Sequence, residues 1–121
     1  MSNLSNKSAI LQLAARKYII KEINHLVKLF PKAKVRYEYD SKAAVHVIEV
    51  LPLELYHSNK DYLAWEDDVF SRFSKKYPTE NICFISEDSL VGINKTDYAI
   101  EGKEFGFEES EMVLMVPASF T

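Results

Sequence analysis

The sequence predicts an α+β domain in which two helices pack on a mixed β-sheet. Three patterns lead to this fold class. Residues 10–30 and 60–77 carry apolar side chains at helical spacing, residues 33–39 alternate between polar and apolar, and residues 43–51 form a mostly apolar run. The length of 121 residues suits a single α+β domain over residues 1–121. We therefore expect the order α-β-β-α-β, followed by short strands.

The first helix is expected over residues 10–30, after a polar cap among residues 5–8. Pro31 ends it, because proline lacks the amide hydrogen and restricts the residue before it. Some of its apolar residues lie outside the main apolar arc. They predict a second packing surface, and possible homodimer contacts, at Ile10, Leu13 and Ile20.

The two runs that follow predict a β-hairpin, with residues 33–39 as a half-buried strand and residues 43–51 as its partner. Asp40, Ser41 and Lys42 supply the turn between them. Residues 52–59 fit either a loop or the first turns of the second helix, for which Ser58 or Asn59 is the expected cap. That helix ends before Pro78.

A third strand is expected at residues 81–86, buried on both faces. Because a long helical connection precedes it, this strand should run parallel to the second one through a right-handed crossover. Beyond it the pattern weakens. Short pieces at residues 90–93, 98–100 and 105–107 lead to an apolar run at residues 112–116, which we interpret as a last strand.

The composition is that of an ordinary globular protein, with 47% apolar and 27% charged residues. No apolar run reaches the roughly 20 residues that a membrane-spanning helix needs. The N-terminus lacks a secretory signal pattern, and the single Cys83 gives no internal disulfide. These features predict a cytoplasmic protein. No motif for a cofactor or a metal is present, so none is expected.

Two glutamates stand where apolar residues are expected. Glu22 and Glu66 fall on the apolar faces of the two helices, and Glu49 lies in the second strand. Burying an unpaired carboxylate is costly. The three carboxylates therefore either line a polar cavity, as in an enzyme or a ligand- or metal-binding protein, or are satisfied separately. Suitable partners are Arg36, Arg72 or a tyrosine hydroxyl.

The charge is divided unevenly along the chain. Residues 1–42 hold nine basic and three acidic side chains, whereas residues 43–121 hold six basic and fifteen acidic ones. An acidic surface attracts a basic protein partner. Our leading hypothesis is therefore a non-catalytic domain that binds another protein through an acidic surface, for which the candidate residues are Asp67, Asp68, Glu87 and Asp88.

Nucleic-acid binding is the remaining alternative. The polar face of the first helix is basic, and a basic stripe is the usual electrostatic footprint of a nucleic-acid interface. Against this alternative, the chain is acidic overall, with a net charge of −3, and it carries no recognised nucleic-acid motif. The residues that would serve it are Lys17, Lys21, Lys28, Lys32, Lys34 and Arg36.

Overall fold

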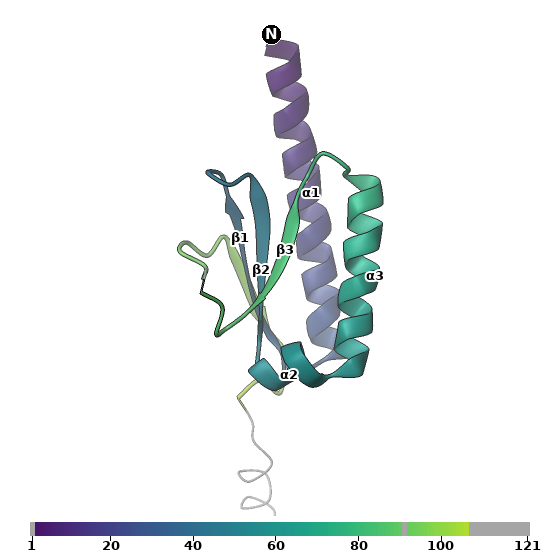
Figure 1. The fold of residues 1–121 in the computed structure, drawn as a ribbon, viewed down its shortest axis with the longest axis vertical. Coiled ribbons are helices and arrows are strands. Elements are labelled where there is room, and N and C mark those ends of the chain that lie inside the picture. The colour runs from purple at the N-terminus through teal and green to yellow at the C-terminus, as the bar shows by residue number, and fades with distance from the viewer. Residues whose placement is uncertain (1, 91, 107–121) are drawn as a thin grey trace, which may run out of the picture.

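A computed structural model of the chain describes residues 2–90 and 92–106 (Figure 1). Within these ranges three helices and four strands form the predicted α+β fold. In chain order the elements are α1 (Ser2–Leu29), β1 (Lys34–Asp40), β2 (Val45–Leu51), α2 (Leu53–Ser58), α3 (Lys60–Lys76), β3 (Ile82–Ser86) and β4 (Tyr98–Glu101).

The four strands form one mixed sheet in the order β3-β2-β1-β4. β1 pairs antiparallel with β2 and with β4, whereas β2 pairs parallel with β3. The predicted hairpin and the predicted parallel crossover are therefore both confirmed. α3 provides the crossover, since it leads from the end of β2 back to the start of β3 (Figure 1).

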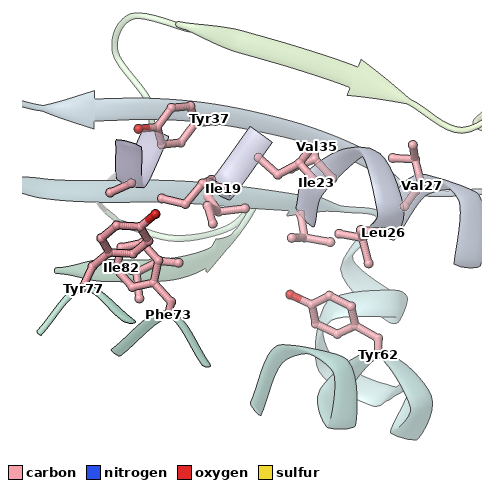
Figure 2. Packing of buried hydrophobic residues seen from close by; sticks show 14 residues of the cluster. Ile19, Ile23, Leu26, Val27, Val35, Tyr37, Tyr62, Phe73, Tyr77 and Ile82 are labelled. Atoms are coloured by element: carbon pink, nitrogen blue, oxygen red, sulfur yellow. The ribbon is translucent and has the colours of Figure 1, made fainter. Parts of the chain in front are cut away.

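The core lies between one face of the sheet and the two long helices. Alternate strand residues such as Val35 and Tyr37 of β1 point toward α1 and α3, where they are fully buried. Figure 2 shows Ile19 and Ile23 of α1 against this face, and Phe73 and Tyr77 next to Ile82 in the same cluster. The predicted helical periodicity placed these residues correctly, because one face of each helix must be buried.

The opposite face of the sheet is crossed by the connection between β3 and β4. These strands occupy opposite edges of the sheet, and the described residues 87–90 and 92–97 belong to the connection that joins them. The side chain of Glu38, on the face away from the helices, holds the connection by accepting hydrogen bonds from the backbone amides of Asn94 and Lys95. Both faces of the two central strands are thus partly covered.

The boundaries of the helices differ from those predicted. α1 begins at Ser2, eight residues before residue 10, because extending an existing helix avoids the cost of nucleation. Residues 52–59, which fitted two predictions, form the separate helix α2. Asn59 lies between α2 and α3 with extended backbone, and its side chain accepts a hydrogen bond from the amide of Tyr62. The prediction of Asn59 as a cap is confirmed.

The third strand is not buried on both faces as predicted. Cys83 is exposed, because it lies on the sheet face that the helices do not cover. Tyr98–Glu101 confirms one of the expected short strands, whereas residues 90, 92 and 93 and residues 105 and 106 are not in strands. The last strand predicted at residues 112–116 lies outside the described residues.

Within the described residues, every helix is too short or too polar to cross a bilayer.

Candidate functional site

The three predicted carboxylates occupy three separate environments. Glu22 lies between the two long helices, where Arg72 of α3 donates to both of its oxygens, with an Nη1 to Oε1 distance of 2.7 Å. The same guanidinium also reaches Asp68 and the hydroxyl of Tyr18. The hydrogen bonds that Arg72 donates to Glu22 and Asp68 raise the pKa of Arg72. Glu22 and Arg72 therefore form an ion pair that joins α1 to α3.

Glu49 faces away from Glu22, on the side of the sheet that the helices leave uncovered. Its neighbour Ile48 points into the core, and successive strand residues alternate between faces. Arg36, its cross-strand partner on β1, donates to both carboxylate oxygens at 2.6 and 2.9 Å. The side chain of Glu49 is only 4% exposed. Geometry therefore separates Glu49 from the two helical glutamates.

His46 lies on the helix-facing side of β2 and is fully buried. Its Nδ1 is 2.7 Å from the hydroxyl of Tyr37, and its Nε2 is 2.7 Å from a carboxylate oxygen of Glu80. Burial lowers the pKa of His46 more than the hydrogen bond to Glu80 raises it. The neutral ring therefore donates from Nε2 to Glu80 and accepts from Tyr37, which leaves no free position for chemistry.

Glu66 has the least complete set of partners. It is half-buried on the side of α3 nearest to β3, and its carboxylate accepts one hydrogen bond, at 3.2 Å, from the hydroxyl of Tyr62. Burial raises the pKa of Glu66, the hydrogen bond from Tyr62 lowers it, and the neighbouring charge of Asp67 raises it. Glu66 makes no ion pair with any residue that the structure describes.

A hollow opens directly beside Glu66, between α3 and the outer edge of β3. Its volume is about 230 Å³, and none of its lining residues is cationic. Its lining combines apolar and aromatic side chains with two carboxylates, and Phe70 among them is 49% exposed. The lining residues are Tyr56, Glu66, Asp67, Phe70, Ile82 and Phe84.

The turn after β3 brings Asp88 to the same neighbourhood, where its carboxylate lies 3.7 Å from Nε2 of His57, the residue next to Tyr56. Burial chiefly raises the pKa of Tyr56, and the charge of Glu66 raises it further. The hydroxyl of Tyr56 donates to the backbone oxygen of Phe84 at 2.9 Å, which fixes the ring at the edge of β3. We call this set of lining residues, together with Asp88, the acidic hollow.

The four acidic residues predicted for partner binding are thus divided. Asp67 and Asp88 both belong to the acidic hollow, and a hydrogen bond from the hydroxyl of Ser86 chiefly lowers the pKa of Asp88. Glu87 follows β3 and is exposed. Asp68 points to the other flank of α3, where it pairs with Arg72. Two of the four residues, Asp67 and Asp88, therefore lie at the acidic hollow. Glu87 is next to Asp88 in the sequence, and Asp68 lies on the other flank of α3.

The basic residues predicted for nucleic-acid binding do not share one surface. Lys17, Lys21 and Lys28 are exposed on α1. Arg36 lies on the far face of the sheet in its ion pair with Glu49, and Lys34 lies over the ring of Phe105. The three residues predicted for homodimer contacts differ in exposure, since Ile10 and Leu13 are exposed whereas Ile20 packs against the core.

The sequence pattern pointed to Glu66 and to Asp67 but missed Phe70 and Phe84 of the hollow. Phe70 belongs to the apolar stripe of α3, so it was expected in the core together with Phe73. Phe84 was expected inside a doubly buried strand. Because β3 is an edge strand, neither ring is fully covered. No local pattern reports which strand lies at the edge.

The part of the chain that the structure describes contains no cluster of three or more histidine, cysteine or acidic side chains arranged to hold a metal ion. Comparison of the chain with protein-family models, with curated proteins and with solved structures found no match.

Proposed function

We propose that this protein is a non-catalytic binding domain that recognises a basic segment of another protein through the acidic hollow. One observation carries the proposal: Glu66 is half-buried beside aromatic rings, and among the residues that the structure describes only the neutral hydroxyl of Tyr62 donates a hydrogen bond to it. A desolvated carboxylate of this kind gains more from a cation than a fully hydrated one does. The incoming cation would be a lysine or arginine side chain of the partner.

The size and lining of the hollow support this choice of ligand. A volume of about 230 Å³ is below the range usual for drug-sized ligands, but it suits one long side chain. The aliphatic stem of lysine or arginine would lie along Phe70 and Phe84, and its charge would reach Glu66. A cation near aromatic faces gains roughly 0.5–2 kcal/mol from them, depending on its hydration.

The distribution of the other carboxylates favours binding over catalysis. Acid–base chemistry by paired carboxylates requires two such groups near one another. Glu22 and Glu49 instead form ion pairs with Arg72 and Arg36, on different sides of the sheet. We also expect the exposed Cys83 to be in the reduced state, which suits a cytoplasmic protein.

The proposal can be tested with the simplest basic probes. We expect Nα-acetyl-lysine methylamide and its arginine counterpart to shift the amide resonances of residues 66, 67, 70 and 84 in a two-dimensional NMR titration. The neutral norleucine analogue should shift them much less. Affinity should fall as the pH is lowered toward the pKa of Glu66, because a protonated carboxyl no longer attracts the cation.

Two variants at one position separate binding from folding. Glu66→Gln should fold normally and lose most of the lysine-dependent shifts. Glu66→Leu should bind the lysine probe even more weakly. It should nevertheless raise the free energy of unfolding, because an apolar side chain then packs against the aromatic residues that line the hollow. Asp61→Asn, an exposed acidic residue at the start of the same helix, is the matched control. If all three variants bind the probes equally, the proposed function is wrong.

A further inference from the structure

The N-terminal half of α1 extends beyond the rest of the fold. The hydroxyl of Tyr77, the residue that follows α3, donates a hydrogen bond to the backbone oxygen of Ala14 in α1, at 3.4 Å. Residues 2–13 lie before this point, and at 1.5 Å per residue they span about 18 Å. Figure 1 shows this part of α1 projecting past the sheet and past the end of α3.

The projecting half carries large apolar side chains with high exposure. Ile10 is 66% exposed, Leu11 is 44% exposed and Leu13 is 53% exposed. With 100° between successive helical residues, these three side chains span an arc of about 160°, which is as wide as the buried face of an ordinary surface helix. Leu11 also continues the buried row of Ala15 and Ile19, four and eight residues further on.

Basic residues lie at both ends of this apolar stretch along the helix axis. On the helical wheel Lys7 and Lys17 fall within the arc, three residues before Ile10 and four residues after Leu13, and both are exposed. The first 21 residues contain four basic side chains and no acidic one. A surface that fits the arc therefore has an apolar centre and carries negative charge at positions about 15 Å apart, the distance from residue 7 to residue 17 along the helix.

We propose that the projecting half of α1 is a docking surface for an acidic amphipathic helix of another protein. A second copy of this chain fits less well. Antiparallel pairing centred on residue 12 would place Lys7 opposite Lys17, and parallel pairing would place each lysine next to its equivalent, so like charges meet in both arrangements. A lipid surface also fits less well, because residues 2–13 contain no aromatic residue and six serine, asparagine or glutamine residues.

The test uses two synthetic helical peptides of 21 residues with the same leucine and isoleucine heptads. One has glutamate and the other has lysine at the flanking positions. We expect fluorescence anisotropy to show binding of the full chain to the glutamate peptide, at least tenfold tighter than to the lysine peptide. The double variant Lys7→Glu/Lys17→Glu should reverse this preference, whereas Lys28→Glu, further along the same helix, should leave it unchanged.

The apolar contribution has a closely matched control. Ile10→Ser combined with Leu13→Ser should weaken binding of the glutamate peptide at least tenfold. Leu29→Ser should have no effect, although Leu29 on the same helix is as exposed as Leu13, at 53%. Unchanged melting temperatures would exclude loss of folding, and Glu66→Gln should bind the peptide normally, so this docking surface and the acidic hollow can fail independently.

Four results would overturn the proposal. The first is equal binding of the two peptides, and the second is no binding of the glutamate peptide. The third is sedimentation of the free chain as a dimer that the Ile10 and Leu13 substitutions dissociate. The fourth is binding of the chain to anionic phosphatidylglycerol vesicles that those substitutions abolish and that the glutamate peptide does not compete with. The third result would identify a second copy as the occupant, and the fourth a lipid surface.

Discussion

Removing Arg36 should destabilise the fold far more than removing Glu49, although the two side chains form a single ion pair. Their exposures differ sharply: the side chain of Arg36 is 38% exposed and that of Glu49 is 4% exposed. Without its partner, the guanidinium of Arg36 can rotate toward the solvent, whereas the carboxylate of Glu49, which is held on a central strand, cannot. Arg36→Leu therefore leaves a buried charge, and Glu49→Leu leaves a solvated one.

The size of the difference follows from the burial of the remaining charge. Removing one partner of a buried ion pair costs about 3–5 kcal/mol, because the other charge stays desolvated and uncompensated. Since the side chain of Arg36 is partly exposed, the lower end, about 3 kcal/mol, applies to Arg36→Leu. Glu49→Leu should cost less than about 1 kcal/mol, because the introduced leucine side chain would lie beside Ile85, the register partner of this position on β3.

The assay is urea unfolding of the wild type, both single variants and the double variant Arg36→Leu/Glu49→Leu at pH 7. We expect the double variant to recover most of the stability lost in Arg36→Leu. Equal losses in the two single variants, or a double variant no more stable than Arg36→Leu, would refute the reasoning that Glu49 is the desolvated partner.

Two further predictions concern the packing of the fold and its response to pH. Gly102→Ala should destabilise the protein by about 1–3 kcal/mol in urea unfolding, because the added Cβ would lie 2.0 Å from the backbone oxygen of Pro31, whereas Gly92→Ala, with no atom within 4 Å, should not. His46 should make the fold less stable as the pH falls below 6.5, because burial lowers its pKa in the folded state and the unfolded chain binds the proton more tightly. The slope is at most about 1.4 kcal/mol per pH unit, and it should be smaller in His46→Asn but not in the control His25→Gln, whose histidine is exposed. An equal slope in His46→Asn would contradict the assignment of this titration to His46.

Local patterns sufficed for most of the secondary structure. Apolar periodicity identified both long helices, alternation identified the hairpin, and Pro31 and Asn59 marked boundaries. These features act over a few residues, through backbone hydrogen bonding and the burial of one face, so a single sequence reveals them. The start of α1 was missed, because residues 2–9 continue a helix for which their own side chains give no apolar signal.

The partners of the inward carboxylates could be foreseen only as types. The sequence singled out Glu22, Glu49 and Glu66 as groups that need a partner, and arginine or tyrosine as suitable ones. The register of β1 against β2 decided that Glu49 meets Arg36, and the packing of α1 against α3 decided that Glu22 meets Arg72. Both decisions join residues 13 and 50 positions apart, beyond the reach of any local pattern.

By itself the sequence determined that this chain is an α+β fold and that Glu66 occupies an unusual position on an apolar helix face. Only the tertiary structure decided that Glu66 lies at the open edge of the sheet, beside Phe70 and Phe84, rather than in a closed core. The physical reason is that helical periodicity fixes the direction of a side chain relative to its own helix. Strand order, which depends on every long-range pairing at once, decides whether protein or solvent lies in that direction.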